Sequence, residues 1–454
     1  MDKNHKLELM PIKKLFFEMA IPTLLAQLVS LLYNVVDRMY VGRIEGSGSL
    51  ALAGLGVSFP IILLISAFSG LIGMGGAPRA AIAMGNKDNN TAEKILGNSI
   101  TMLLGLSVIL FTAFYFSKDF ILMAFGASAQ SLPYASDYLT IYLYGTPFVM
   151  LTFGLNIFIT NQGFTKISMI TVIIGCVLNI ILDPIFIFAL NMGVKGAALA
   201  TIISQGVSAF FVIGFLLSKK STLKVRLKNL KLSKVLVGSI LSLGVSPFLM
   251  QSTECLIQLI FNTGMQKYGN DNYVALMSIF FSVTQILLMP MQGLTQGVSP
   301  IISYNYGAKN MARVRETFNL LFTVCISLSA ISVVFAEIFP GVLIGLFTSD
   351  ASLIALGIKP LRIFVFGMAI FGAQSACQQT FLALGQAKVS MFLAALRKII
   401  LLTPLALLLP LIPKLGIWGL FIAEPVSDIL ATTTTIIMFI FMSKKLGFRK
   451  EKIK

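Results

Sequence analysis

Long apolar stretches recur along the chain and are separated by short polar or basic segments. Twelve of these stretches reach about the 20 residues that a helix needs to cross a bilayer. The pattern therefore predicts an all-α polytopic membrane protein with twelve transmembrane helices. The expected spans are residues 14–39, 52–83, 95–117, 138–160, 168–190, 196–217, 236–262, 273–303, 316–338, 358–382, 390–412 and 417–442.

Composition supports a membrane location and argues against an enzyme. Hydrophobic residues make up 56% of the chain and charged residues 12%, whereas soluble domains carry about 25% charged residues. The four cysteines all fall in apolar spans, and the chain has one histidine. These residues exclude a disulfide framework, a His/Cys metal site and a histidine-based catalytic triad. We expect no catalytic residues and no cofactor.

The net charge of +17 at pH 7 is explained by membrane topology rather than by nucleic-acid binding. With twelve spans and a cytoplasmic N-terminus, most of the 35 lysines and arginines lie in cytoplasmic segments. We therefore expect a multi-pass protein of the cytoplasmic membrane, with both termini in the cytoplasm. The most basic segments, 218–234 and 444–454, would attract anionic lipid headgroups.

The two halves of the chain repeat each other in a nearly constant register. An offset of 222 or 223 residues brings similar residues together over more than half of each repeat, which indicates two lobes of six helices in the same orientation. The expected organisation is an amino-terminal lobe at 1–217, a basic cytoplasmic linker at 218–235, a carboxy-terminal lobe at 236–442 and a basic tail at 443–454. Matched pairs include Pro78 with Pro300, Gly145 with Gly367, Gly163 with Gly385, Lys166 with Lys388 and Gly193 with Gly416.

Asp183 is the most unusual residue, because it lies in the middle of an apolar stretch that no other charge interrupts. A carboxylate in a membrane span is costly, so it should face protein or water and serve a function. Asn179 lies one turn earlier on the same helix face. Pro184 cannot donate to the carbonyl of Ile180, so a bend is expected there.

Asp37 is the second acid of this kind, near the end of the first span, with Asn34 one turn earlier. In the repeat, Asp183 corresponds to Leu405 and Asp37 to Asn262, so the two acids belong to one lobe. Burial and like-charge repulsion would favour a neutral acid in such a pair. The pair could hold a proton, or it could coordinate Na⁺ together with Asn179. The sequence leaves both alternatives open.

The second lobe has its own intramembrane charges. Glu254 could form a second cation site or receive a cationic substrate, and Glu424 and Asp428 add further acids. Arg397 and Lys398 could pair with these acids, although snorkelling of their charged ends to the cytoplasmic face is the simpler interpretation. Weak candidates for an adaptable apolar substrate cavity are Met150, Phe153, Met289 and Met291.

These residues together resemble the multidrug and toxic compound extrusion (MATE) family. The resemblance covers nearly the whole chain and includes the two six-helix lobes and the Asn179, Asp183 and Pro184 pattern. It implies that Asp37, Asn179, Asp183 and Thr201 form a proton or cation coupling cluster, with Asn156 nearby. In another branch of the family a pair of carboxylates in the second lobe couples to Na⁺. Here Glu254 matches one member, but Gln374 and Ser375 occupy the place of its partner.

The sequence and the resemblance lead to one main hypothesis. The protein would be an antiporter that uses H⁺, Na⁺ or both to export amphipathic, often cationic, drugs by alternating access, and it would be monomeric. A lipid-linked oligosaccharide flippase is the alternative, but such proteins typically have more spans or a cavity lined with arginine and lysine. An intramembrane aspartyl protease is remote, because neither Asp37 nor Asp183 lies in a GxGD motif.

Overall fold

The computed structural model describes residues 4–445, and within this range the chain forms helices and no strand. Ten helices are long and apolar enough to cross a membrane, and two bent pairs complete twelve spans. The predicted twelve-helix membrane fold is confirmed. The α-helices are α1 (Asn4–Leu9), α2 (Ile12–Gly42), α3 (Gly48–Gly85), α4 (Asn89–Ala124), α5 (Leu132–Tyr144), α6 (Thr146–Asn161), α7 (Thr165–Pro184), α8 (Val194–Leu217), α9 (Lys234–Tyr268), α10 (Asp271–Gly307), α11 (Met311–Ile338), α12 (Pro340–Gly345), α13 (Ala351–Val365), α14 (Met368–Ala383), α15 (Ala387–Ala395), α16 (Thr403–Leu408) and α17 (Ile417–Lys445).

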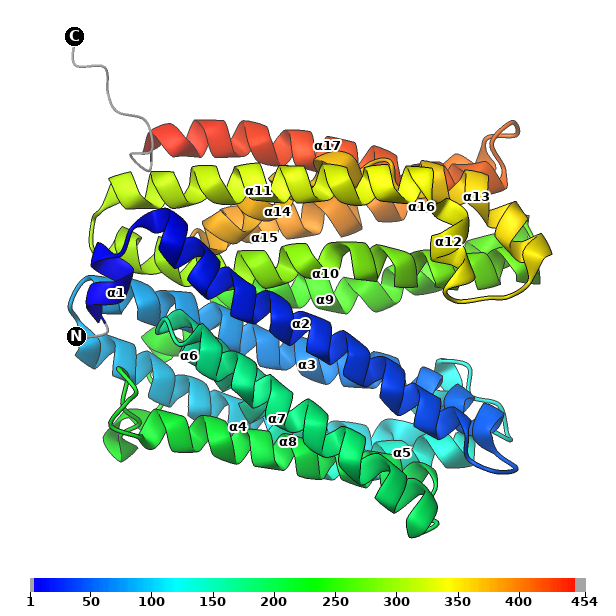
Figure 1. Ribbon diagram of the computed structural model, residues 1–454, viewed down its shortest axis with the longest axis horizontal. Helices are drawn as coiled ribbons and strands as arrows, with labels where there is room; N and C mark the ends of the chain where they lie inside the picture. Colours follow the sequence, from blue (N-terminus) through cyan, green and yellow to red (C-terminus); the bar gives the residue numbers. More distant parts are fainter. Residues whose placement is uncertain (1–3, 446–454) are drawn as a thin grey trace.

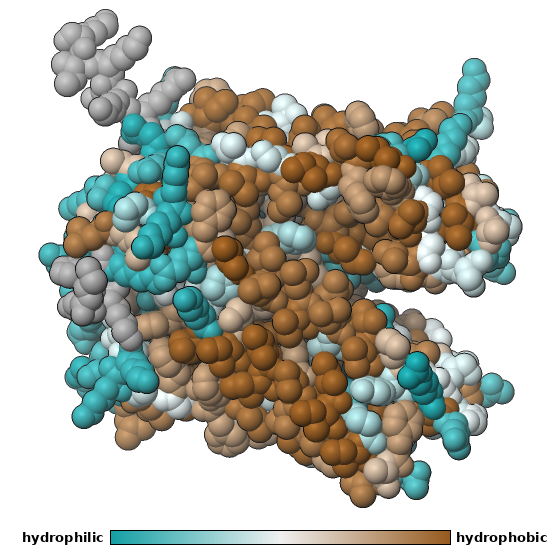
Figure 2. Space-filling model, viewed as in Figure 1, coloured by the Kyte–Doolittle hydropathy of each residue, from teal (hydrophilic) through white to brown (hydrophobic). Residues whose placement is uncertain are grey.

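The helices are arranged in two lobes that lie side by side (Figure 1). Helices α2 to α8 form one lobe and α9 to α17 the other, and α2 runs diagonally along the junction. The surface is largely apolar between two polar ends, and a notch separates the lobes at the edge away from the chain termini (Figure 2). The tail predicted at 443–454 lies outside the described residues beyond Lys445.

Backbone conformation supports the internal repeat. Two expected spans are broken, between α5 and α6 with a bend of 59° and between α13 and α14 with a bend of 42°. The breaks fall at Gly145 and Gly367, which the 222-residue offset pairs. Three further pairs share a positive φ, a conformation that side chains disfavour. These pairs are Lys87 (62°) with Lys309 (57°), Gly163 (87°) with Gly385 (70°), and Gly193 (55°) with Gly416 (49°).

Each lobe also contains one π-helical segment in its fifth span, although the two do not coincide in the repeat, because the 222-residue offset carries 185–189 to 407–411. The segment η1 (Ile185–Ala189) follows Pro184, and η3 (Leu396–Leu402) precedes Pro404. The expected irregularity at Pro184 is thus a π-helix, closed by a bond from the Leu190 N–H to the Ile185 carbonyl at 2.9 Å. Single-turn π segments inside α-helices often occur at functional sites.

Glycines join the two lobes at the end of the bundle that carries the termini. A Cβ on Gly244 of α9 would overlap the carbonyl oxygen of Leu71 in α3. A Cβ on Gly307 of α10 would overlap the carbonyl oxygen of Ile82 in α3. The helices of the two lobes therefore touch backbone to backbone, which only glycine permits. We call these contacts the glycine seal.

Adding one methyl group to this seal is expected to destabilise the described conformation. For Gly244→Ala we expect the free energy of unfolding to fall by about 1–3 kcal/mol, because overpacking forces backbone shifts. The control is Gly238→Ala on the same helix, where a Cβ meets nothing within 4 Å. That change should be neutral or stabilising by up to about 1 kcal/mol. The unfolding temperature in detergent is measured for both variants. Equal changes in Gly244→Ala and Gly238→Ala would contradict the backbone contact at Gly244.

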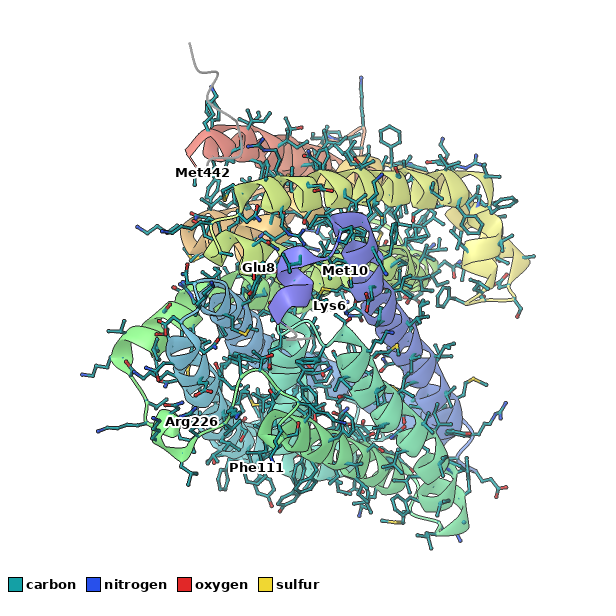
Figure 3. The ribbon with its side chains drawn as sticks, turned by 60° about the vertical axis from the view of Figure 1, so that its left-hand side comes forward. Lys6, Glu8, Met10, Phe111, Arg226 and Met442 are labelled. Carbon is teal, nitrogen blue, oxygen red and sulfur yellow. The ribbon has the colours of Figure 1, made fainter. Side chains whose placement is uncertain are left out.

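The short helix α1 also spans the junction at this end (Figure 3). Its Leu7 carbonyl accepts hydrogen bonds from Asn305 of α10 at 3.1 Å and from Arg313 of α11 at 3.1 Å. Lys6 forms an ion pair with Glu18 of α2 at 2.6 Å. The segment before α2 thereby ties the first membrane helix to the second lobe.

Candidate functional site

Asp183 is fully buried at the end of α7, directly before the π-helix. Asn179 is 1% exposed and lies on the same face. With its amide turned to satisfy both groups, Asn179 donates to Asp183 Oδ2 at 2.8 Å and accepts from the Thr201 N–H at 3.2 Å. Thr201 of α8 in turn donates from its hydroxyl to the Ala197 carbonyl at 3.0 Å. Three of the expected residues therefore form one hydrogen-bonded group between α7 and α8.

Asp37 of α2 completes this group from the other side. Its side chain is buried and lies within hydrogen-bonding range of Asp183. Asp37 Oδ1 is buried without a hydrogen-bond partner among the described residues. Two carboxyl groups in such proximity can share a single proton, as carboxyl pairs in other buried sites do. The four residues that the family resemblance singled out are thus brought together.

Tyrosines surround this group, and the sequence reasoning missed them. Tyr33 of α2 and Tyr138 of α5 both lie near Thr201 and Asp37. Tyr138 stacks on Tyr142, with ring centroids 6.1 Å apart and planes inclined at 17°. The one available signal was Tyr33, which lies one turn before Asp37. Tyr138 was hidden because its approach depends on the bend between α5 and α6.

Two other expected members of the cluster lie elsewhere. Asn34 is exposed, and its amide donates to the Ser30 carbonyl on the same helix at 2.7 Å. Asn156 of α6 donates to the Ser168 carbonyl of α7 at 3.3 Å. Ser168 precedes Asp183 by roughly 22 Å along α7 at the usual helical rise. The structure does not bring Asn34 and Asn156 together with the two acids.

The second lobe contains a network of five charged residues, four of them buried and Glu254 partly exposed. The snorkelling interpretation of Arg397 and Lys398 is wrong. Arg397 is 8% and Lys398 7% exposed, and both lie on η3 inside the bundle. Their positions are explained by the acids, which supply the counter-charges that burial requires. Arg397 binds Asp428 at 2.7 Å and Glu424 at 3.3 Å, and Lys398 binds Glu254 at 3.0 Å.

Two side chains of α14 near this network, Phe371 and Gln374, are neutral. Phe371 of α14 lies beneath Arg397, with the guanidinium carbon 4.2 Å from the ring centroid. Gln374, which occupies the place of the expected acid, accepts a hydrogen bond from Thr432 at 3.3 Å. Glu254 therefore has Lys398 as its partner, and Gln374 supplies no second carboxylate.

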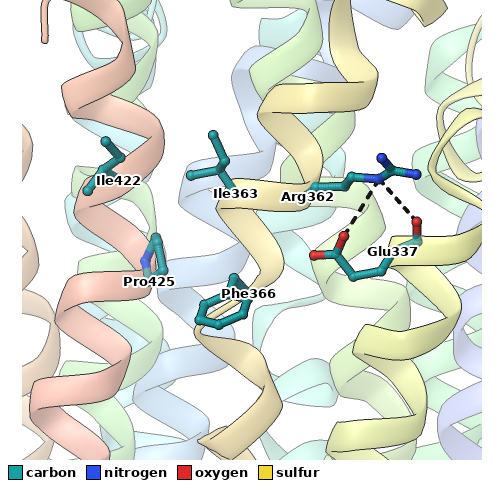
Figure 4. Close-up of a pocket in the computed structure, with 6 residues that line it drawn as sticks. All are labelled: Glu337, Arg362, Ile363, Phe366, Ile422 and Pro425. Atoms are coloured by element: carbon teal, nitrogen blue, oxygen red, sulfur yellow. Dashed lines mark hydrogen bonds and ion pairs between the residues drawn. The ribbon is translucent and has the colours of Figure 1, made fainter.

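The weak cavity candidates divide into buried and exposed residues. Met150, Met289 and Met291 are at most 8% exposed, so they are packed in the core in this conformation, whereas Phe153 is 50% exposed. A separate apolar pocket of about 300 Å³ lies between α11, α13 and α17 (Figure 4). Its polar edge is the Glu337–Arg362 ion pair at 3.6 Å. No group of three or more His, Cys, Asp or Glu residues that could hold a metal ion occurs within residues 4–445.

Twelve spans in two repeated lobes, with acids buried inside each lobe, define a membrane transporter. The MatE family profile matches residues 22–185 and 248–408. The chain belongs to this family.

Individual relatives agree with this assignment, and solved structures share the fold. The chain is 30% identical to the multidrug export protein MepA of Staphylococcus haemolyticus (strain JCSC1435), with 92% of each chain covered. It is 28% identical to MepA of Staphylococcus aureus (strain NCTC 8325 / PS 47), with 91% of each covered. A multidrug resistance MATE family transporter, solved in an outward-facing conformation, superposes with a TM-score of 0.91 at 22% identity, covering 98% of this chain and 99% of that one. A transporter of the same superfamily from Pyrococcus furiosus gives the same score, identity and coverage.

Proposed function

We propose that the protein is a cation-coupled antiporter that exports amphipathic, often cationic, drugs across the cytoplasmic membrane by alternating access. The observation that carries the proposal is the carboxyl pair Asp37 and Asp183, buried within reach of each other in the first lobe. A membrane protein keeps such a costly pair where it binds and releases a cation. The export activity that the MepA relatives are named for supports drugs as the substrate class.

The coupling cluster consists of Asp37, Asn179, Asp183 and Thr201, with Tyr33 and Tyr138 beside it. Protonation would remove the repulsion between the two carboxylates, and Na⁺ would do the same while accepting the Asn179 and Thr201 oxygens as ligands. Loss of the cation would restore the repulsion and push α2 away from α7. The proposed coupling step is thus a change in the packing of α2.

Because α2 lies between the two lobes, a change in its packing affects both of them. Its first-lobe partner is α7, and its second-lobe partner is α10. On α10, Gly293 and Gly297 allow the α2 backbone to approach closely, since a Cβ on Gly293 would lie 2.7 Å from Leu24 Cα. A shift of α2 relative to the acid pair therefore changes a contact between the lobes, which is what alternating access requires.

The membrane orientation is also part of the proposal. Both termini are placed in the cytoplasm, with lobes at 1–217 and 236–442 joined by the linker at 218–235. The notch between the lobes then opens outward (Figure 2). The similarity to a transporter solved in an outward-facing conformation supports this assignment.

The test is drug transport by the purified protein in liposomes with one ion gradient at a time. We expect uphill movement of tetraphenylphosphonium with an imposed proton gradient, a Na⁺ gradient or both. No accumulation under either gradient would overturn the antiport proposal. Facilitated equilibration without a gradient would identify a uniporter instead.

A further inference from the structure

The charged network of the second lobe is unbalanced. Three carboxylates, Glu254, Glu424 and Asp428, face two cations, Arg397 and Lys398. With all five ionised, one negative charge is left without a partner. An uncompensated charge in a protein interior is costly, so the network should gain from one additional monovalent cation.

Glu254 is the member of the network that a ligand can reach. Its side chain is 38% exposed, whereas that of Lys398 behind it is 9% exposed. On the same helix, the Phe248 ring lies 4.8 Å from the Phe68 ring of the first lobe. The amide nitrogen of Gln251 lies 3.2 Å from the place that a Cβ on Gly70 would take.

These contacts join α9 of the second lobe to α3 of the first lobe. Glu254 lies one turn beyond Gln251 on the same face of α9, so its partly exposed carboxylate lies at the junction of the two lobes. It therefore presents its carboxylate to the space from which a substrate would come.

Glu424 is an alternative ion-pair partner for Lys398. Glu424 Oε2 is buried and has no hydrogen-bond partner among the described residues. Lys398 is already close enough to Glu424 for an electrostatic interaction. Lys398 also lies within η3, where the π-helical backbone departs from regular α-helical packing. Movement of the Lys398 ammonium group from one carboxylate to the other would exchange Glu254 for Glu424 as its partner.

We propose that the Glu254–Lys398 ion pair is a substrate subsite for the cationic group of an amphipathic ligand, in which the Lys398 ammonium holds the place of that cation until the ligand binds. On binding, the ligand cation pairs with Glu254 and Lys398 turns to Glu424. Three cations then face three carboxylates, and the network is neutral. A neutral ligand of the same shape offers no charge to release Lys398. This subsite rests on the proposed export of cationic drugs.

Equilibrium binding to the purified protein in detergent, without any gradient, tests the subsite. The probes are tetraphenylphosphonium, a lipophilic cation, and triphenylphosphine oxide, a neutral molecule of similar shape. In Lys398→Met the competing ammonium is absent, so the affinity for tetraphenylphosphonium should rise about tenfold, equivalent to about 1.4 kcal/mol. In Glu254→Gln it should fall about tenfold. The affinity for triphenylphosphine oxide should stay within about twofold in both variants.

Glu424→Gln provides an independent measurement if Lys398→Met does not yield folded protein. It removes the second partner of Lys398, so the affinity for tetraphenylphosphonium should fall while that for the neutral probe is unchanged. The matched control is Lys388→Met, an exposed lysine on α15, where neither affinity should change. The proposal is overturned if the variants leave tetraphenylphosphonium binding unchanged, or if they change the binding of both probes equally.

The binding experiment can refute the subsite without refuting the antiport proposal, and the transport experiment can do the reverse. If wild-type protein exports tetraphenylphosphonium under a gradient but the three variants bind it normally, the subsite is wrong and the antiporter stands. If binding follows the expected pattern but no gradient drives export, the coupling is wrong and the subsite stands.

Discussion

Export driven by an ion gradient is expected to fall to the level of protein-free liposomes in the Asp183→Asn variant. Asparagine keeps the size of the side chain but cannot gain or lose a proton. It also removes the charge that attracts a cation, in a place where Asp183 is fully buried. Asp37→Asn should have the same effect, because the pair acts as one unit. The measurement is uphill accumulation of tetraphenylphosphonium in liposomes under the gradient that drives the wild type.

The control for this experiment is Asp88→Asn. Asp88 is exposed and caps α4 by accepting a hydrogen bond from the Thr91 N–H at 3.0 Å. Asparagine is an equally good capping residue, so this variant should transport normally. Equilibrium binding of the drug should persist in Asp183→Asn, which separates coupling from folding. Gradient-driven export that survives in both aspartate variants would refute the assigned cluster.

The largest effect on stability is expected for Arg397→Met. This change leaves Glu424 and Asp428 buried without their shared counter-ion, since Arg397 contacts them at 3.3 and 2.7 Å. Removing one partner of a buried ion pair typically costs about 3–5 kcal/mol. We expect a marked decrease in the unfolding temperature in detergent. The triple variant Arg397→Met, Glu424→Gln, Asp428→Asn should recover most of the loss, because no unpaired charge remains.

Arg362→Met is the matched control for this loss of stability. Arg362 pairs with Glu337 at 3.6 Å at the polar edge of the pocket in Figure 4, and its side chain is 48% exposed. An exposed pair of this kind contributes less than about 1 kcal/mol. Similar losses in Arg362→Met and Arg397→Met would show that the buried network does not stabilise the second lobe.

Much of the fold could be predicted because its signals are repeated and physically strong. Apolar stretches of bilayer length place all twelve spans, and the constant offset between the halves places the paired glycines. The breaks at Gly145 and Gly367 were not predicted, since a glycine in an apolar stretch is compatible with a continuous helix. The bend depends on packing, as Gly367 lies against Pro425 and Asp428 of α17.

The candidate site was predicted less evenly. Asp183 and Asn179 share one helix face, so the sequence alone pairs them, whereas Thr201 entered only through the family resemblance. Asn34 lies one turn before Asp37, yet its side chain lies on an exposed face. Residues three positions apart point in somewhat different directions around a helix, so one can be buried and the other exposed. The partners of Arg397 and Lys398 could not be chosen from sequence, since pairing with Glu254, Glu424 and Asp428 requires three helices to meet.

The glycine seal has a consequence for how this protein can be regulated. The contacts of Gly244 with Leu71 and of Gly307 with Ile82 join backbone to backbone, so these contacts themselves involve no titratable side chain. A change of pH or the binding of substrate should therefore leave the strength of these backbone contacts unchanged. Whatever drives its opening has to be generated elsewhere in the lobes and transmitted through the helices. Inhibitors that act on the glycine seal would have to fit between two backbones and match their spacing, because the seal offers no charged group to compete for.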